Sequence, residues 1–396
     1  MTKLEKLIQE FCPDGVEFRP LEQCCNILDR KRKPVTKSSR EAGKYPYYGA
    51  NGIQDYVSDY IFDGTFILVG EDGSVITDRG TPVVTWASGK IWVNNHAHII
   101  EGNGTVLLRF LYHYIQTIDV SPLIHGNIPK LTGGDFRALT IPVPPLEVQR
   151  EIVRILDTFT ELTAELTAEL TARQKQYEYY RDMLLSFGEN GGEETGNNIN
   201  FFLVAEIADT NIGLATTVTK YKANQGVLLI HNSDIQENEI VLKQHEYITE
   251  AFAEKNHKKR LQENDVITVH TGDVGTSAVI SKEYAGAIGF TTITSRIRNP
   301  QKVLPEYFCH YLNSHRCKAE IASMTISDRS NLNQNCFEKL RIPIPPIDEQ
   351  RRIVTILDHF STLCTDLTSG LPAEIEARKK QYEYYRDNLL SFTPAD

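Results

Sequence analysis

The sequence predicts an α+β fold with an internal pseudo-twofold repeat, in which two mixed α/β modules are separated by two long antiparallel α-helices. Two repeats predict it: residues 141–157 (IPVPPLEVQREIVRILD) recur as 342–358 (IPIPPIDEQRRIVTILD), and residues 175–187 (KQYEYYRDMLLSF) recur as 380–392 (KQYEYYRDNLLSF). A third observation is that the blocks between the repeats differ in sequence but share one plan. The 396 residues are therefore predicted to form a tandem of two units.

The first unlike block, residues 1–143, combines strand-like runs with a short helix. Its composition predicts strands at 65–69, 82–86 and 91–100, a helix over roughly 106–118 and a closing strand in LTIPV. The second block, residues 201–345, repeats this order. Its strands are expected at 227–230, 265–269 and 277–280, its helix at 305–323 and its closing strand in LRIPI. Both blocks are predicted to be mixed α/β modules. The polar, Gly-rich segment 188–200 is predicted to be a flexible linker.

The repeated segments, residues 144–187 and 346–392, predict long helices. Each opens with Pro-Pro followed by acidic residues, which suit the first turn of a helix. Large residues then recur at steps of three and four, the seam of a coiled coil with one extra four-residue step. The second segment has one further step of four at Gly370 and Pro372, where we expect a kink or a short break.

A helix with one apolar stripe needs a partner, so we expect the two helices to pack antiparallel on each other. Separate packing of each helix on its own module is the alternative, and the seam could also receive helices of a partner protein. The predicted helix and subunit interface consists of Ile152, Ile155, Phe159, Leu162, Leu166, Leu170, Tyr177, Tyr180, Leu184, Ile353, Ile356, Phe360, Leu363, Leu367, Tyr382, Tyr385 and Leu389.

Composition and charge predict a soluble cytoplasmic protein with reduced thiols. Hydrophobic residues make up 41% and charged residues 24%, and no secretory signal or membrane-spanning run is found. The seven cysteines contain no CxxC pair, which argues against a disulfide scaffold and gives no zinc-ligand spacing. Most of the net charge of −10 falls in residues 144–200 and 346–396. The two modules are nearly neutral, so the overall acidity does not argue against binding of nucleic acid.

The sequence lacks the motifs of common enzyme classes. It contains no GxxxxGK[ST] phosphate loop, no GxGxxG after a strand, no GxSxG elbow and no HExxH. His96 and His98 alternate in a predicted strand without a third identifiable ligand, so a structural role is predicted for them. We therefore expect this chain to hold no catalytic residue and no metal.

Signals for nucleic-acid binding are clearer. Seven Lys or Arg residues fall within residues 30–44 against one acid, and three tyrosines follow directly. Cations beside aromatic and amide side chains suit phosphate contact with base reading next to it, although a solvated basic loop is the alternative. The predicted DNA contacts of the first module are Lys31, Arg32, Lys33, Lys37, Arg40, Lys44, Tyr47, Tyr48, Asn51, Asn127 and Lys130.

The second module carries a comparable set of polar and basic residues. It has a basic run at 255–260, a strand that alternates Thr and Arg at 290–298, and a polar loop at 327–335. Its predicted DNA contacts are Lys258, Lys259, Arg260, Thr292, Thr294, Arg296, Arg298, Arg329, Ser330, Asn331 and Asn333.

The paired segments PPLEVQREIVRILD and PPIDEQRRIVTILD, each leading into KQYEYYRDxLLSF, resemble the conserved regions of type I restriction–modification specificity subunits. PYYGANGI (46–53) and ILVGEDGS (67–74) look like that family's first target recognition domain. VLLIHNSDI (227–235) and DVITVHTGDVG (265–275) look like its second. The resemblance covers essentially the whole chain.

The resemblance implies a non-catalytic subunit that recognises a bipartite, asymmetric DNA site. It also implies assembly with two modification subunits that use S-adenosylmethionine and with restriction subunits that translocate and cut. S-adenosylmethionine, ATP and Mg are then expected on those partners and not on this chain. A coiled-coil scaffold whose globular ends bind protein or carbohydrate is the alternative from another class of protein.

A tandem tetrapeptide, ELTAELTAELTAR (161–173), lies within the first predicted helix. Four helical residues advance the chain by about 6 Å and over-rotate it by about 40°. One base-pair step is about 3.4 Å and about 34–36°. We predict that the number of tetrapeptides sets the spacing between half-sites, although a merely good helix-forming sequence is the alternative.

Overall fold

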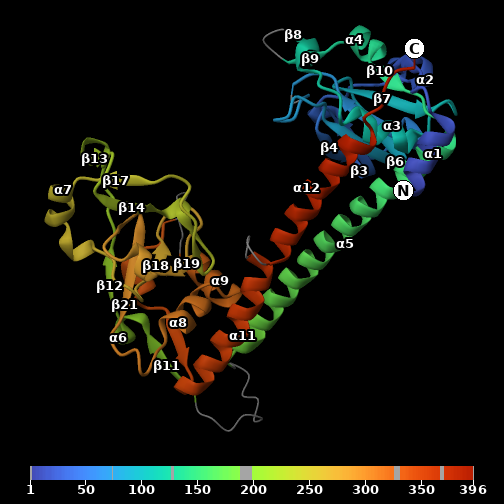
Figure 1. Ribbon diagram of the computed structural model, residues 1–396. Coiled ribbons are helices and arrows are strands. Elements are labelled where there is room, and N and C mark those ends of the chain that lie inside the picture. Colours follow the sequence, from blue (N-terminus) through green and yellow to red (C-terminus); the bar gives the residue numbers. More distant parts are fainter. Residues whose placement is uncertain are drawn as a thin grey trace. The chain divides into compact units, whose positions relative to one another are not determined.

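The computed structural model describes residues 2–73, 75–125, 129–187, 199–324, 331–365 and 370–395 (Figure 1). No helix within these ranges has the length and apolar character needed to span a membrane. The chain forms two compact units. Unit 1 contains Met1–Thr167 and Glu374–Asp396, and unit 2 contains Ala168–Ala373. Each unit thus combines one predicted module with parts of both repeated segments.

Unit 1 is built on a six-stranded sheet with the strand order β2-β7-β5-β6-β3-β4. Its strands are β2 (Cys25–Ile27), β7 (Ala97–Gly102), β5 (Phe62–Gly70), β6 (Val84–Val93), β3 (Ala42–Gly49) and β4 (Gly52–Val57). Two further pairs are β1 (Phe18–Pro20) with the closing strand β10 (Thr140–Pro142), and β8 (Ile124–His125) with β9 (Lys130–Leu131). The helices are α1 (Lys3–Phe11), α2 (Leu21–Cys24), α3 (Leu108–Ile115) and α4 (Gly133–Ala138).

The strand expected at 91–100 is wrong as a single element. Residues 91–93 complete β6, a turn follows, and β7 begins at Ala97. The side chain of Asn94 accepts a hydrogen bond from the backbone N–H of His96 at 2.8 Å. An asparagine that bonds the backbone two residues on stabilises a turn against a strand. As a result His96 lies in the turn, and only His98 lies on the strand.

Unit 2 contains two four-stranded sheets. One has the order β12-β21-β18-β19 and the other β13-β17-β14-β20, where β14 and β20 run parallel. Their strands are β12 (Ala208–Ile212), β21 (Thr292–Ile297), β18 (Val266–Val269), β19 (Ser277–Val279), β13 (Lys222–Ala223), β17 (Glu246–Ile248), β14 (Val227–His231) and β20 (Ile288–Phe290). Two small pairs are β11 (Asn200–Leu203) with the closing strand β22 (Arg341–Ile344), and β15 (Ile235–Gln236) with β16 (Glu239–Ile240).

The helix expected at 305–323 is two helices in the structure. The helices of this module are α6 (Val204–Ile207), α7 (Glu250–Lys255), α8 (Pro305–Leu312), α9 (His315–Met324) and α10 (Gln334–Phe337). Between α8 and α9, the buried side chain of Asn313 bonds both the N–H and the C=O of Ser277, each at 2.9 Å. These bonds tie the end of α8 to β19 and explain why one helix does not continue.

The repeated segments form long helices, as predicted. The first is one continuous helix, α5 (Leu146–Leu185). The second is α11 (Ile347–Thr365) followed by α12 (Leu371–Leu389), with Gly370 in a bend and residues 366–369 outside the described ranges. The predicted interruption at Gly370 is confirmed. The predicted linker lies almost wholly outside the described residues, because only 199 and 200 of its residues are included.

Each unit contains one antiparallel pair of helix segments. In unit 1, Phe159 of α5 stacks on Tyr385 of α12 with ring centroids 5.1 Å apart. In unit 2, Tyr180 of α5 stacks on Phe360 of α11 at 5.4 Å. Phe159 and Phe360 are repeat equivalents, and so are Tyr180 and Tyr385. The same contact is therefore made once in each unit, which confirms the pseudo-twofold repeat and the antiparallel packing.

Most residues of the predicted helix seam are buried or partly buried in the structure. Ile152 and Ile353 are fully buried in the cores of units 1 and 2. The other seam residues in the described ranges are partly buried, and Tyr385, at 39% exposed, is the most exposed of them. Leu367 lies outside the described residues.

Candidate nucleic-acid interface

The basic loop of the first module, residues 30–44, has two kinds of cation. Lys31, Lys33, Lys37 and Lys44 are exposed. None of the four forms an ion pair with an acid among the residues described, although Lys33 and Lys44 lie over the rings of Trp92 and Tyr45. Exposed lysines of this kind are free to contact phosphates.

Arg32 and Arg40 are held within the protein instead. Arg32 Nη1 lies 2.6 Å from Glu71 Oε2 and donates to the carbonyl of Ala97 at 2.6 Å. Arg40 pairs with Asp55 at 3.2 Å and lies over the ring of Tyr47, 4.1 Å from its centroid. Both arginines were predicted to contact DNA. Their contacts fix the loop that carries the free lysines.

The aromatic residues of this region also support the loop. Tyr47 is 1% exposed, and its hydroxyl exchanges hydrogen bonds with the backbone of Val35. Trp92, which the sequence did not single out, donates its indole N–H to the carbonyl of Lys33 at 2.6 Å. Together these side chains border a pocket of about 210 Å³. Tyr48 is 8% exposed, Asn51 is exposed between β3 and β4, and Asn127 lies outside the described residues.

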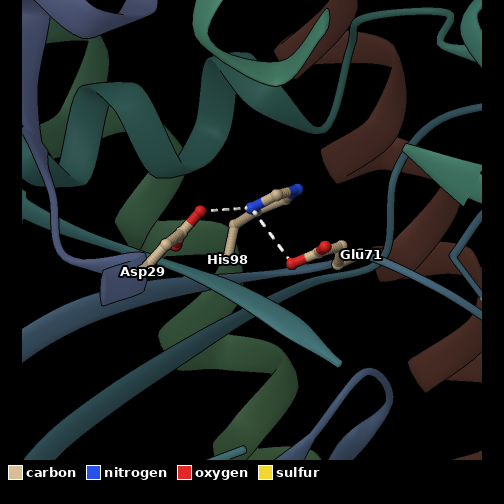
Figure 2. Close-up of side chains that lie close together, drawn as sticks. All are labelled: Asp29, Glu71 and His98. Atoms are coloured by element: carbon tan, nitrogen blue, oxygen red, sulfur yellow. Dashed lines mark hydrogen bonds and ion pairs between the residues drawn. The ribbon is translucent and has the colours of Figure 1, made fainter. Parts of the chain in front are cut away.

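A buried ion cluster lies where this loop meets the ends of β5 and β7. His98 is fully buried, with Nδ1 2.7 Å from Asp29 Oδ2 and 3.6 Å from Glu71 Oε2 (Figure 2). Its Nε2 lies 3.0 Å from the carbonyl of Leu131, and its ring stacks on Phe136 at 4.1 Å. Both ring nitrogens of His98 therefore face oxygen atoms.

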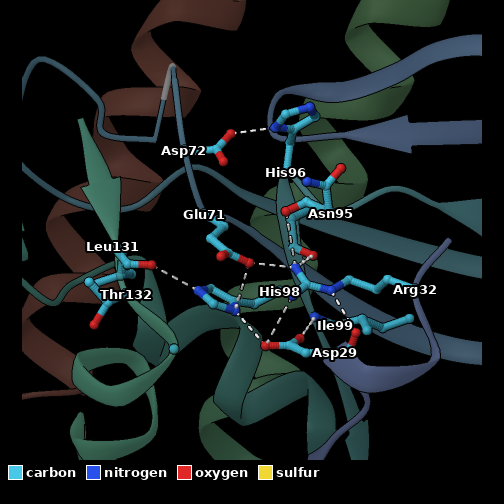
Figure 3. A network of polar contacts seen from close by, with 12 residues as sticks. Asp29, Arg32, Glu71, Asp72, Asn95, His96, His98, Ile99, Leu131 and Thr132 are labelled. Carbon is cyan, nitrogen blue, oxygen red and sulfur yellow. Dashed lines mark hydrogen bonds and ion pairs between the residues drawn. The ribbon is translucent and has the colours of Figure 1, made fainter. Parts of the chain in front are cut away.

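The cluster is balanced by opposite charges. Arg32 pairs with Asp29 and Glu71 (Figure 3). Lys130 pairs with Glu71 at 3.2 Å. Burial raises the pKa of Asp29, but hydrogen bonds from His98 and the Ile99 N–H, with the nearby cations, bring it below its ordinary value. The candidate ligand atoms of Asp29, Glu71 and His98 lie within 4.8 Å of one another. Because cations already occupy both carboxylates, we assign no metal here.

Five of the eleven predicted contacts of the second module line one hollow of about 200 Å³. It is lined by Lys258, Lys259, Arg260, Thr294 and Arg296, together with Asn211. Lys258 forms no ion pair among the described residues. The other cations are engaged: Arg296 is bidentate to Asp265, Arg260 pairs with Glu250, and Lys259 donates to backbone carbonyls of residues 212 and 213.

The remaining predicted contacts of this module are dispersed. Thr292 is fully buried in β21, and its hydroxyl has no hydrogen-bond partner in the described structure. Arg298 pairs with Asp209 at 2.8 Å. Asn333 caps α10, and Asn331 accepts a hydrogen bond from the Thr271 hydroxyl at 2.8 Å. Arg329 and Ser330 lie outside the described residues.

These features define a class: a two-module binding protein in which one helix framework, used twice, carries two unlike binding surfaces. Comparison with known proteins agrees. The profile of the type I restriction modification DNA specificity domain matches residues 13–173 and 198–377. The chain belongs to the family of type I restriction–modification specificity subunits.

Two relatives illustrate the membership. A putative type I restriction enzyme specificity subunit of Haemophilus influenzae is 38% identical, with 99% of each chain covered. The specificity subunit of the EcoR124I and EcoR124II enzymes of Escherichia coli is 34% identical over 72% of this chain and 71% of its own.

Solved structures share the fold. The specificity subunit of Mycoplasma genitalium superposes with a TM-score of 0.56 at 15% identity, covering 95% of this chain and 96% of its own. A chain from a structural study of type I complex assembly and conformational transition gives 0.60 at 18% identity, covering 96% and 98%. Members of the family are non-catalytic DNA-recognition subunits, and partner subunits carry the catalysis. Membership excludes the scaffold alternative.

Proposed function

We propose that this subunit binds a bipartite, asymmetric DNA site, with each module reading one half-site and the helices setting the spacer. The observation that carries the proposal is the combination of a repeated helix contact with modules whose loops differ. The helix contact of Phe159 with Tyr385 recurs as Phe360 with Tyr180, whereas the loops of the two modules differ in sequence. Two modules with different loops on a repeated helix framework suit a bipartite DNA site whose half-sites differ.

The subunit would recruit two modification subunits, and restriction subunits would join that assembly. A repeated framework offers the same surface twice, which supports two copies of one partner. Tyr179 and Tyr384 are repeat equivalents and are 65% and 66% exposed on their helices. S-adenosylmethionine, ATP and Mg would be held by the partner subunits, which carry the catalysis in this family.

The test is genome-wide mapping of methylated adenine in cells that express this chain with its modification subunits. The expected result is one motif with two specified parts, separated by a spacer of fixed length that is not read. A continuous motif, a palindromic motif or methylation without a shared motif would contradict the proposal.

A further inference from the structure

In both modules, the residues that follow a central strand form the same two backbone contacts with a later segment of the chain. We call this pair of contacts the junction. In unit 1, the N–H of Leu131 donates to the carbonyl of Glu71 at 2.8 Å, and Asp72 and Lys130 form an antiparallel bridge. In unit 2, the N–H of Leu332 donates to the carbonyl of His270 at 2.8 Å, and Thr271 and Asn331 form the corresponding bridge. Glu71 and His270 each directly follow a central strand, β5 or β18.

The backbone of the junction is the same in both modules, but its side chains are not. Unit 1 places Asp72 and Lys130 there. The carboxylate of Asp72 also contacts the ring of His96, which lies in the turn between β6 and β7 (Figure 3). Unit 2 places Thr271 and Asn331 there, joined by a hydrogen bond of 2.8 Å. One backbone arrangement that carries different polar side chains can present different hydrogen-bond donors and acceptors to the edges of different bases.

These side chains are available to a ligand. In unit 1 the side chains of His96 and Lys130 are 48% and 47% exposed, and that of Asp72 is 23% exposed. In unit 2 Asn331 is exposed and Thr271 is half-buried. The exposed Lys31 and Lys33 flank Arg32 in the sequence, and Arg32 donates to the carbonyls of Asn95 and Ala97 and pairs with Glu71 of the unit 1 junction.

Each junction is also held rigidly. Below the unit 1 junction lies the buried cluster of Asp29, Glu71 and His98, paired with Arg32 and Lys130. Pairing on several sides fixes these groups before a ligand arrives and lowers the entropy lost on binding.

The unit 2 junction is held by different contacts. Asn232 donates to the carbonyl of Thr271 at 2.6 Å, and the N–H of His270 donates to the carbonyl of Thr291 at 3.1 Å. Thr291 has a φ of 53°, which is strained for a β-branched residue. Such strain concentrates at functional sites.

Resting on the proposed function, we propose that each junction is a base-reading point, where Asp72, His96 and Lys130 read the first half-site and Thr271 and Asn331 read the second. The ligand at each point is the edge of a base pair. An Asp beside a Lys suits a G·C pair, since the carboxylate accepts from cytosine N4 and the ammonium donates to guanine O6 or N7. The neutral amide and hydroxyl of unit 2 suit an A·T pair, because Asn matches the N6 and N7 edge of adenine.

The test uses the full chain assembled with its modification subunits and maps methylated adenines for Asp72→Asn and Thr271→Val. Asp72→Asn is expected to lower the methylation rate of the original site about tenfold and to relax one G·C position of the first half-site. Thr271→Val is expected to do the same at one A·T position of the second. Asp78→Asn and Thr217→Val, which change exposed residues outside the junctions, are controls that should keep the wild-type motif and rate.

Three results separate the possible failures. If the wild-type complex methylates a bipartite motif and both variants keep that motif and rate, the base-reading inference is overturned while the proposed function stands. A change in the opposite half-site, or at no single position, overturns it as well. A wild-type complex without a bipartite motif refutes the proposed function itself. Should Asp72→Asn reduce folded yield, His96→Ala replaces it, because that side chain is half exposed in a turn and carries the same expectation.

Discussion

At the scale of residues, pairing divides the basic groups of the first module into those that support the loop and those that are free. Arg32 has 12% of its side chain exposed and contacts two carboxylates, whereas its neighbour Lys31 is exposed and unpaired among the described residues. Adjacent positions in one basic run therefore have different physical roles. The sequence run alone does not distinguish them.

This division predicts opposite effects for two neighbouring substitutions. Arg32→Ala leaves Asp29 and Glu71 buried without their guanidinium and should lower the free energy of unfolding by about 3 kcal/mol. Lys31→Ala should leave stability within about 0.5 kcal/mol. It should instead weaken DNA binding by the assembled complex at all sequences. The slope of the logarithm of the binding constant against the logarithm of the salt concentration should become smaller by about 1. Denaturant unfolding and binding titrations over a salt series measure the two effects, and equal loss of stability in both variants would contradict the assignment.

A second prediction at this scale concerns acid stability. Glu151 of α5 accepts hydrogen bonds from Arg154 and from Lys3, which lower its pKa to about 2. A carboxyl whose folded pKa is depressed adds stability above its unfolded pKa, and this stability is lost as the pH falls toward the folded value. The extra stability of wild type over Glu151→Gln should therefore be present above about pH 4.5 and should disappear toward about pH 2.

Unfolding in urea at several pH values measures this difference. Glu161→Gln, at an exposed position further along α5, is the matched control and should show no such dependence. A stability difference between wild type and Glu151→Gln that is independent of pH between 2 and 5 would show that the ion pairs with Lys3 and Arg154 do not form in solution.

At the scale of elements, the most accurate predictions concerned segments that recur in the sequence or that carry large residues at a regular helical spacing. The long helices and the interruption at Gly370 followed from the seam and from Pro372. The strand predicted at 91–100 and the helix predicted at 305–323 are each two elements in the structure. In both cases an asparagine side chain forms a hydrogen bond with backbone groups, in a turn or in a distant strand. Asn94 ends β6 through its bond to His96, and Asn313 ends α8 through its bonds to Ser277. Period and propensity do not reveal whether an asparagine forms such a bond, locally as Asn94 does or to a distant strand as Asn313 does.

The candidate site was less predictable for the same reason. The basic run was visible, but the acids that engage it are distant in sequence, as Glu71 is from Arg32 and Asp265 from Arg296. Trp92 was missed because a single tryptophan in a strand carries no signal of the backbone that it supports. Only the folded arrangement identifies which cations are free.

The tandem tetrapeptide of α5 gives a prediction at this scale. Residues 161–173 lie within one uninterrupted helix, and Leu162, Leu166 and Leu170 are half-buried along it. Inserting one LTAE unit keeps the seam and lengthens the helix by about 6 Å. The expected motif has a spacer longer by about one base pair and unchanged half-sites. Replacing Thr163 and Thr167 by Ala without a change of length is the control. Methylation mapping that shows an altered half-site at constant spacing would refute the prediction that the number of tetrapeptides sets the spacing.

At the scale of the whole molecule, the repeat extends from the helices to the polar contacts that attach each module. His113 pairs with Asp157 at 2.9 Å in unit 1, and His310 pairs with Asp358 at 2.8 Å in unit 2. Gln149 bonds the N–H of Leu107, and its equivalent Gln350 bonds the N–H of Leu304. Each module is thus attached to its helices by equivalent contacts, although the sheets of the two modules differ. A framework kept twice with such fidelity suits a partner that must bind it twice.

This argument leads to a prediction about assembly. Tyr179 and Tyr384 present equivalent exposed rings, and buried tyrosines at interfaces commonly contribute strongly to affinity. Replacing either tyrosine with Ala should weaken the binding of one of the two modification subunits about tenfold. Replacing both should weaken the binding of the two subunits alike. Native mass spectrometry of the assembled complex over a range of concentrations would report the loss of one copy and then of both. Tyr56→Ala, which removes an exposed tyrosine of β4, is the control and should keep two copies bound. If both single variants and the double variant also keep two copies at wild-type affinity, the partner does not use these rings, and the repeated surface that it binds lies elsewhere on the helices.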